Sequence, residues 1–234
     1  MKSFYIAPSV MCVDLMNIER DIRKLENLAV DYLHVDIMDN HFVPNLMLPL
    51  SISSSFREIS EIALDIHLMV SDPASCLDKL SLPRPNMNDI ISIHYESTPH
   101  VQRVLDQIKK LGFKAGIALC PSTPIGVLED LLPSIDMVLL MTVNPGFSGQ
   151  SLVPGMIDKI LRLKQYLIQR EFDHILIEVD GNVNFEYGPL MYQNGADIFV
   201  VGTSSLFHHQ DTLEKNHEKF IQLLNNTKRV FDES

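Results

Sequence analysis

Short apolar runs alternate along the chain with longer segments in which apolar residues recur every three or four positions. The short runs predict buried strands, because parallel strands covered on both faces are almost continuously apolar. The predicted strands are Phe4–Val10, Tyr32–Asp36, Leu64–Met69, Asp89–His94, Lys114–Leu119, Met137–Met141, Ile175–Val179 and Ile198–Val201. The predicted helices are Asn17–Ala29, Ile52–Ile62, Pro73–Leu80, His100–Leu111, Pro124–Leu132, Pro154–Gln169, Phe185–Gln193 and Thr212–Lys228.

Strict alternation of strand and helix predicts a parallel sheet with right-handed crossovers. Eight such units in 234 residues fit a closed barrel better than an open, doubly wound sheet. No Gly/Ser-rich or Pro-rich linker and no strong repeat divides the chain. We therefore predict an α/β protein, a single (β/α)8 TIM barrel domain over residues 1–234.

Amino-acid composition limits the kinds of binding partner and the cellular location that we expect for this protein. The 30 acidic against 19 basic residues give a net charge of −11, which disfavours nonspecific binding to nucleic acid or to anionic membranes. The apolar runs are too short for a membrane span, and the N-terminus has no signal-peptide pattern. Cys12, Cys76 and Cys120 are odd in number and lack Cys-x-x-Cys spacing. We expect a cytoplasmic protein with reduced thiols and no nucleic-acid or membrane partner.

The segment His34-Val35-Asp36-Ile37-Met38-Asp39 stands out at the end of the second predicted strand. His34 and Asp36 are two residues apart, so in a strand they point to the same face. An imidazole and a carboxylate on one face can hold a metal or move a proton. An isolated His or Asp is more often a hydrogen-bonded surface group, so the pair needs support from the rest of the chain.

That support comes from residues at or just after the other strand ends, the rim where barrel enzymes carry their chemistry. They are Ser9, His34, Asp36, His67, His94, Met141, Asp180 and Gly202. Two imidazoles and two carboxylates among them, those of His34, Asp36, His67 and Asp180, suit a divalent metal. The alternative is four unrelated polar groups on the rim. We assign no role to His94.

Phosphate-binding candidates follow the last three strands. Asn144–Gln150 is a loop with two glycines, although loops of this kind are common turns. Gly181 and Gly202-Thr203-Ser204 follow the seventh and eighth strands, where such barrels often bind phosphate with backbone N–H groups. An acidic protein would then need no Lys or Arg cluster there. Gly146 and Gly149 could hinge a lid that excludes water.

Several motifs occur together in a fixed order: Ala7-Pro8-Ser9, His34 to Asp39, His41 to Asn45, Asp65 to Val70, Asn144 to Gln150 and Glu178 to Gly181. This combination resembles the ribulose-phosphate 3-epimerase family over about Phe4 to Phe207. Met11–Leu15 and Gly202–Phe207 resemble the branch that acts on D-allulose 6-phosphate. The chain departs from the family pattern at Asn40 and Asn182, where the family has Gly, and in the segment Leu82–Asn88.

The resemblance implies the remaining assignments. One divalent metal per subunit, Zn²⁺ first with Fe²⁺, Mn²⁺ or Co²⁺ as alternatives, would be held by His34, Asp36, His67 and Asp180. Asp36 and Asp180 would be the catalytic acid and base, and Met38, Met69 and Met141 would line the intermediate. Substrate would be bound by Ser9, His67, Gly146, Phe147, Ser148, Gly149, Asp180, Gly181, Asn182, Gly202, Thr203 and Ser204. A homo-oligomer, dimer or hexamer, is expected.

The chemistry follows from these groups. Inverting a carbon beside a ketone needs two carboxylates on opposite faces and a Lewis acid that stabilises the enediolate. The resemblance implies that the substrate is D-allulose 6-phosphate, so we predict a ketose-phosphate 3-epimerase that converts it to D-fructose 6-phosphate. The alternative is the conversion of D-ribulose 5-phosphate to D-xylulose 5-phosphate. Asp39 competes as the acid, but its odd offset from Asp36 should turn it away.

Two other function classes remain open at this point. One is a different phosphate-binding barrel enzyme, such as a decarboxylase or lyase. Such enzymes often use a Lys at the carboxyl end of a strand, and no predicted strand here has a Lys at that end. The other is a binding protein that kept the barrel without catalysis. The presence of both Asp36 and Asp180 disfavours this second class.

Overall fold

The computed structural model describes residues 2–83 and 85–231, which form one continuous sheet covered by helices. The sheet order is β1-β9-β8-β7-β6-β5-β4-β2-β3, and every pairing is parallel except that of β2 with β3. The strands are β1 (Tyr5–Pro8), β2 (Tyr32–Asp39), β3 (Leu46–Met47), β4 (Ala63–Met69), β5 (Ile90–His94), β6 (Lys114–Leu119), β7 (Met137–Met141), β8 (Leu176–Asp180) and β9 (Ile198–Val201).

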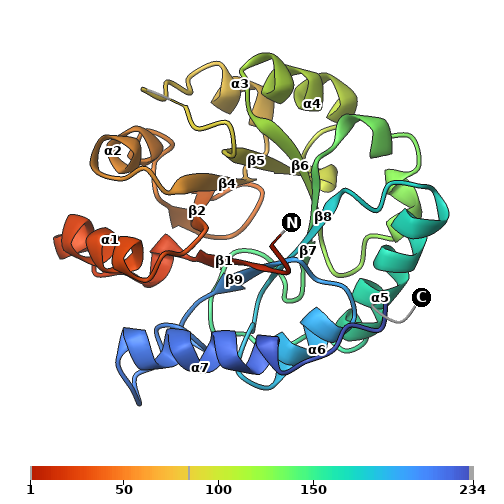
Figure 1. Ribbon diagram of the computed structural model, residues 1–234. Coiled ribbons are helices and arrows are strands. Elements are labelled where there is room, and N and C mark those ends of the chain that lie inside the picture. The colour runs from red at the N-terminus through yellow and green to blue at the C-terminus, as the bar shows by residue number, and fades with distance from the viewer. Residues whose placement is uncertain (1, 84, 232–234) are drawn as a thin grey trace.

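The sheet closes on itself between β1 and β2. Ser9, which follows β1, forms a parallel bridge with His34 of β2, and the Asp31 N–H donates to the Ile6 carbonyl. With β3 as a short antiparallel addition to β2, the other strands make the eight-stranded barrel (Figure 1). The predicted (β/α)8 architecture is therefore confirmed.

The helices form a ring outside the strands (Figure 1). Each turns an apolar stripe toward the sheet, as Ile22 and Leu25 of α1 do, both of them fully buried. The α-helices are α1 (Ile18–Asn27), α2 (Ile52–Ile59), α3 (Pro73–Leu77), α4 (Val101–Lys110), α5 (Met156–Gln169), α6 (Tyr187–Gln193) and α7 (Leu213–Asn225). Short 3₁₀ helices span Val10–Cys12, Leu15–Asn17, Tyr95–Ser97, Ile125–Leu128 and Leu132–Ser134.

The apolar core has two main parts, one on each side of the barrel wall. The larger lies between the strands and the surrounding helices. The smaller fills the barrel interior and includes Tyr32, Ile90, Met137 and Ile198. Above this interior layer the inward side chains become polar toward the carboxyl ends of the strands. The packed floor thus supports a polar rim.

Three predictions of secondary structure need correction. The predicted helix Pro124–Leu132 is a pair of 3₁₀ turns, because Pro124, Gly126 and Pro133 do not sustain an α-helix. The antiparallel strand β3 was not predicted, since two residues carry no periodic signal. Most of the predicted helices end one to three residues short of their predicted limits, as helix ends generally do.

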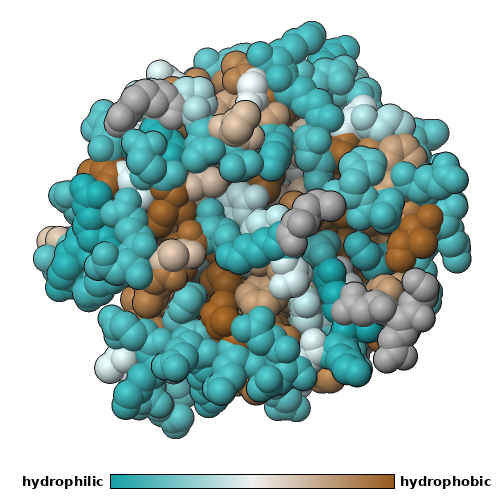
Figure 2. Space-filling model, in the orientation of Figure 1, coloured by the Kyte–Doolittle hydropathy of each residue, from teal (hydrophilic) through white to brown (hydrophobic). Residues whose placement is uncertain are grey.

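The face seen in Figure 2 is mostly hydrophilic, with apolar side chains visible in smaller areas between the charged ones. This distribution is expected of a chain with 30 acidic and 19 basic residues. Across residues 2–83 and 85–231, no helix combines the length and apolar character needed to cross a membrane.

Candidate active site

Strand alternation brings the candidate side chains to one place inside the barrel. Along β2, β4 and β8, every second residue points inward, so each strand contributes a pair of polar groups. The inward groups nearest the rim are His34 and Asp36 from β2, His67 from β4 and Asp180 from β8. Their potential ligand atoms all lie within 4.8 Å of one another. Residues far apart in the sequence therefore form one cluster.

The spacing in this cluster suits a divalent metal. Asp36 Oδ1 lies 3.2 Å from His34 Nε2 and 3.3 Å from His67 Nδ1. Asp180 Oδ2 lies 3.9 Å from each of these two nitrogens. Ligand bonds of about 2.0–2.1 Å in a tetrahedron separate the ligand atoms by about 3.3–3.5 Å. The two carboxylates and two imidazoles thus need only small shifts to surround one ion.

His67 provides an independent test of this fit. Its side chain is fully buried, and Nδ1 has no hydrogen-bond partner among the described residues. A buried polar nitrogen is normally paired, so an unpaired one directed at two carboxylates requires an explanation. A metal ion would use that lone pair. The residues present therefore fit the metal that the family resemblance implies.

His34 is held from behind by a buried carboxylate. Its Nδ1 makes a short hydrogen bond with Asp65, and Glu178 Oε1 lies 3.7 Å away. Burial, together with the neighbouring Asp65 charge, raises the pKa of Glu178 well above its usual value. Asp65 is therefore the group placed to accept the His34 Nδ1 proton. The other ring nitrogen, His34 Nε2, faces the cluster and lies 3.2 Å from Asp36 Oδ1.

The two carboxylates of the cluster differ in environment. Burial alone would raise the pKa of Asp36, but the charge and hydrogen bond of His34 lower it below its usual range. Burial raises the pKa of Asp180 to about 6, an increase to which the charge of Asp36 contributes and which His34 partly offsets. Ser9 Oγ also donates to Asp36 Oδ2 at 3.0 Å. Asp36 is therefore the better stabilised anion of the pair.

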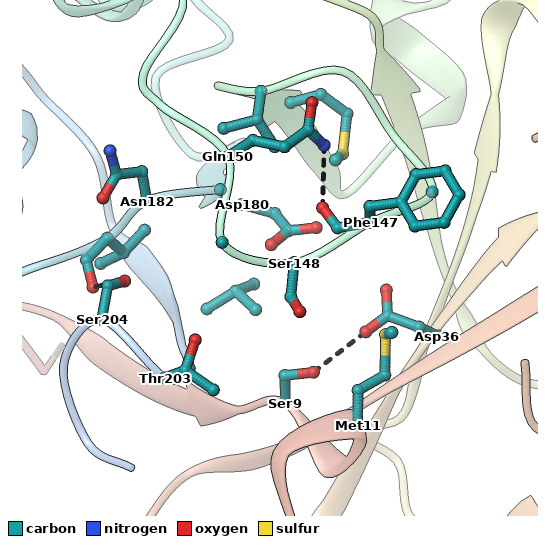
Figure 3. A pocket seen from close by; sticks show the side chains of 18 of the residues that line it. Ser9, Met11, Asp36, Phe147, Ser148, Gln150, Asp180, Asn182, Thr203 and Ser204 are labelled. Atoms are coloured by element: carbon teal, nitrogen blue, oxygen red, sulfur yellow. Dashed lines mark hydrogen bonds between the residues drawn. The ribbon is translucent and has the colours of Figure 1, made fainter. Parts of the chain in front are cut away.

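The two carboxylates of the cluster, Asp36 and Asp180, line a pocket (Figure 3). Asp36 and Ser9 lie on one side of it, Thr203 and Ser204 on the other, and Asp180 and Ser148 between them. Its lining includes Ser9, Asp36, Met38, Met69, Met141, Gly146, Phe147, Ser148, Gly149, Asp180, Gly181, Asn182, Gly202, Thr203 and Ser204. His34 and His67 lie buried beneath this surface. The structure thus gathers every site residue named from the sequence.

The loop from Asn144 to Gln150 covers part of the pocket. Gln150 Nε2 donates to the carbonyls of Asn144 and Phe147, at 2.6 and 2.8 Å, so the loop is tied to itself. Asn45 Nδ2 donates to the Gly146 carbonyl at 2.7 Å and ties the loop to the β2 side. Phe147 is about half exposed, at 52%. The loop therefore has a defined shape above the carboxylates.

Backbone conformation explains why position 181 requires Gly and why Asn can replace the family's Gly at positions 40 and 182. Gly181 has φ +115°, and a Cβ there would lie 2.5 Å from Val143 Cγ2, so no other residue fits. Asn40 and Asn182 adopt φ +58° and +50°, the left-handed region that Asn tolerates. The turns therefore survive both replacements. In the Leu82–Asn88 segment, Arg84 lies outside the described residues.

Asp39 does not join the cluster. Its carboxylate accepts hydrogen bonds from the backbone N–H groups of His41, Phe42 and Ser71 and from the Ser71 hydroxyl, all at 2.7–2.8 Å. Burial would raise the pKa of Asp39, but these bonds lower it below its usual range. The odd offset from Asp36 thus turns this side chain away, as predicted, and gives it a structural role.

Three buried polar residues beside the site had no role in the sequence analysis. Asp65 and Glu178 lie two residues before His67 and Asp180, so the alternation rule that found the ligands could also have found them. The third, His94, stacks on His67 with ring centroids 5.0 Å apart. Burial lowers the pKa of His94 to about 4, so it is a neutral imidazole near pH 7.

A (β/α)8 barrel with a buried His/Asp cluster under a rim pocket has the architecture of the class of barrel enzymes whose chemistry lies at the carboxyl ends of the strands. Comparison with known proteins places the chain within that class. The family model described as "Ribulose-phosphate 3 epimerase family" matches residues 5–207. The chain belongs to the ribulose-phosphate 3-epimerase family. It is therefore an isomerase of the carbohydrate epimerase class.

Curated relatives agree with this assignment. The chain is 38% identical over 199 residues to the ribulose-phosphate 3-epimerase of Bacillus subtilis, covering 85% of this chain and 90% of the relative. It is 36% identical over 230 residues to the enzyme of the same name from Synechocystis, covering 97% and 96%. These relatives favour the pentose alternative over the allulose 6-phosphate reading of the sequence.

Solved structures support the fold alone. KGPDC from Streptococcus mutans matches with a TM-score of 0.71 at 10% identity, covering 96% of this chain and 98% of that one. A mutant tryptophan synthase α-subunit from Pyrococcus furiosus matches with a TM-score of 0.65 at 14% identity, covering 94% and 98%. Similarities at this level of identity concern the barrel, not its chemistry.

Proposed function

We propose that the protein is a metal-dependent ketose-phosphate 3-epimerase that interconverts D-ribulose 5-phosphate and D-xylulose 5-phosphate. The observation that carries the proposal is the position of Asp36 and Asp180. Both line the pocket, come from different strands, and have carboxylate oxygens in the cluster that His34 and His67 complete. Membership of the ribulose-phosphate 3-epimerase family supplies the reaction class.

The carboxylates account for the inversion. One would remove the C3 proton from one face of the substrate and the other would return a proton to the opposite face. The reverse reaction exchanges their roles, so both must reach the same carbon. Ser9 Oγ, which donates to Asp36 Oδ2, holds that carboxylate toward the pocket and is placed to bind a substrate hydroxyl.

A divalent ion held by His34, Asp36, His67 and Asp180 would act as a Lewis acid that favours the enediolate form of the substrate. Two neutral imidazoles and two carboxylates accept Zn²⁺, Fe²⁺, Mn²⁺ or Co²⁺, with Zn²⁺ preferred in a four-coordinate site. Met38, Met69 and Met141 would exclude water from the delocalised negative charge, since their side chains are apolar and polarizable.

The phosphate would bind at the far side of the pocket from Asp36. Asn182, Thr203 and Ser204 lie on that side (Figure 3), and Gly181, Gly202 and the Gly146–Gly149 loop also line the pocket. None of the described residues that line the pocket is Lys or Arg. Backbone N–H groups and the hydroxyls of Ser148, Thr203 and Ser204 would therefore bind the phosphate oxygens.

Comparing kcat/KM for ribulose 5-phosphate and allulose 6-phosphate tests the proposal. The pentose phosphate should be preferred by at least about tenfold, equivalent to about 1.4 kcal/mol in transition-state binding. Solvent deuterium should appear at C3 of both epimers. A preference for the hexose phosphate would reinstate the allulose reading. Absence of C3 exchange with either substrate would overturn the epimerase proposal.

One observation keeps the hexose phosphate as a second candidate. The two segments that resemble the allulose branch both reach the pocket, through Met11 and Cys12 in one case and Gly202–Ser204 in the other. These residues face each other, because a Cβ on Gly202 would lie 3.4 Å from Cys12 Sγ. They therefore border the same part of the pocket, and residue differences there would alter the space available to the substrate.

A further inference from the structure

His94 is a buried residue that does not line the pocket but contacts the candidate metal-binding cluster through His67. Its Nε2 lies 2.9 Å from His67 Nε2, and the two rings stack. On its other side, His94 Nδ1 lies 3.2 Å from Glu96 Oε2. His67, His94 and Glu96 thus form a continuous hydrogen-bonded chain that ends at the candidate metal ligand.

Only one arrangement of protons satisfies this chain when His67 binds a metal. The ligand atom is His67 Nδ1, because Nδ1 faces Asp36 and Asp180. A neutral imidazole whose Nδ1 lone pair is used carries its proton on Nε2. That N–H donates to His94 Nε2, which must therefore be unprotonated. The His94 proton then sits on Nδ1 and is donated to Glu96.

Glu96 sets the direction of the chain because an ionised carboxylate accepts hydrogen bonds and donates none. Its Oε1 accepts from the Cys120 N–H at 2.9 Å and from the Thr123 hydroxyl, which leaves Oε2 for His94. Lys159 Nζ fixes the supporting loop by donating to the carbonyls of Cys120, Pro121 and Thr123 at 2.6–3.1 Å. Glu96, at the end of the hydrogen-bonded series, is therefore held in a fixed position.

We propose that His94 and Glu96 are positioning residues that hold His67 in the tautomer whose Nδ1 binds the catalytic metal. The inference rests on the proposed function, which assigns the metal to this cluster. His34 has a matching arrangement, with Asp65 accepting its Nδ1 proton so that Nε2 faces the metal. Each imidazole ligand thus has a dedicated proton acceptor, a carboxylate for His34 and a neutral imidazole backed by a carboxylate for His67.

The same groups could instead hold a second cation. Cys120 Sγ lies 3.6 Å from His94 Nδ1, and His94, Glu96 and Cys120 offer ligand atoms within 4.8 Å of one another. A cation there would need the Nδ1 lone pair of His94 and would move the His94 proton to Nε2. His67 Nε2 would then become the acceptor, and its own proton would occupy Nδ1. Occupancy of this group and of the catalytic cluster are therefore mutually exclusive.

Metal affinity provides the first test. Zn²⁺ dissociation constants would be measured on metal-depleted protein by competition with a chromophoric chelator, for the wild type and for His94→Phe, His94→Gln and Cys120→Ala. His94→Phe keeps a ring but removes the acceptor, so the dissociation constant should rise about 10–100-fold. His94→Gln restores an acceptor oxygen for His67 Nε2–H and should recover most of the affinity. Cys120→Ala should bind Zn²⁺ as the wild type does.

The tautomer of His67 provides a second test that needs no metal. Heteronuclear NMR of the labelled imidazole nitrogens should show His67 protonated at Nε2 in the metal-free wild type. Glu96→Gln can reverse the direction of hydrogen bonding, so it should give a mixture of tautomers. Thermal melts of each variant check that the barrel remains folded.

The outcomes distinguish the positioning role of His94 and Glu96 from the proposed function. His67 protonated at Nδ1 in the wild type, or unchanged metal affinity in a folded His94→Phe variant, would overturn the positioning role. A loss of Zn²⁺ binding in Cys120→Ala equal to that in His94→Phe would show that the second cation site is used instead. A wild type that binds no divalent metal would overturn the metal-dependent mechanism, and the tautomer measurement would still test the positioning role.

Discussion

Ser9 Oγ donates a 3.0 Å hydrogen bond to Asp36 Oδ2, while Asp36 Oδ1 faces the two histidines of the cluster. The two oxygens of this carboxylate therefore have separate environments, one on the metal side and one on the substrate side. Such a division allows a carboxylate to bind a metal and still reach a substrate carbon, which is what the proposed mechanism requires of both Asp36 and Asp180.

The first prediction concerns these two acids. Asp36→Asn and Asp180→Asn should each lower kcat for epimerisation by about 10²–10⁴-fold, the usual worth of a positioned acid or base. Each variant keeps one carboxylate and should still exchange the C3 hydrogen of one epimer with deuterated solvent without inverting it. Because both residues are proposed ligands, metal content must be measured first. A metal-loaded variant with near wild-type epimerisation would rule out the two-carboxylate mechanism.

Metal removal should separate activity from folding. A chelator should abolish turnover and leave the circular dichroism spectrum unchanged, since the apolar core on both sides of the barrel wall does not depend on the cluster. The melting temperature should fall, because a ligand at 1,000 times its dissociation constant stabilises the folded state by about 4 kcal/mol. Full activity in a preparation shown to be free of metal would contradict the assignment.

Asp39→Asn should affect stability more than catalysis. The bonds from His41, Phe42 and Ser71 lower the folded-state pKa of Asp39, so its ionised form stabilises the native state above the unfolded pKa of about 4. That contribution is lost as the pH falls through the lower, folded pKa. Urea unfolding at pH 7 should show a loss of about 2 kcal/mol, which disappears at low pH. A pH-independent difference would show that the carboxylate charge is not the cause.

Substitutions at Gly202 test whether the phosphate binds at the backbone of this turn. It does not adopt a positive φ, and a Cβ there would meet only Cys12 Sγ, at 3.4 Å, so Gly202→Ala should fold. Gly202→Val should block the approach of phosphate to the backbone and raise KM by about tenfold or more, the cost of one hydrogen bond to a charged group. Gly126→Ala is the matched control, because a Cβ at Gly126 has no atom within 4 Å and the residue lies outside the pocket. An unchanged KM in a folded Gly202→Val variant would place the phosphate elsewhere.

Local features of the sequence were enough to predict the barrel and to identify the polar residues at its rim. Apolar runs separated by helical periodicity reveal strand and helix order, and alternation along a strand is enough to place His34 and Asp36 on one face. The same rule, applied two residues upstream of His67 and Asp180, could have found Asp65 and Glu178. These are properties of short segments, so neighbouring residues determine them.

Contacts between distant segments were decided only by the tertiary structure. His94 had no role that could be predicted from the sequence, because its role depends on β5 lying beside β4 and on Glu96 being anchored by Cys120 and Thr123 across a loop. The failed prediction of a helix over Pro124–Leu132 and the unpredicted strand β3 have a similar origin. Both segments are too short or too interrupted to specify their own conformation, so packing against the closed barrel determines it. Hydrogen-bond direction and tautomer depend on such packing, since they require partners that only folding brings within about 3 Å.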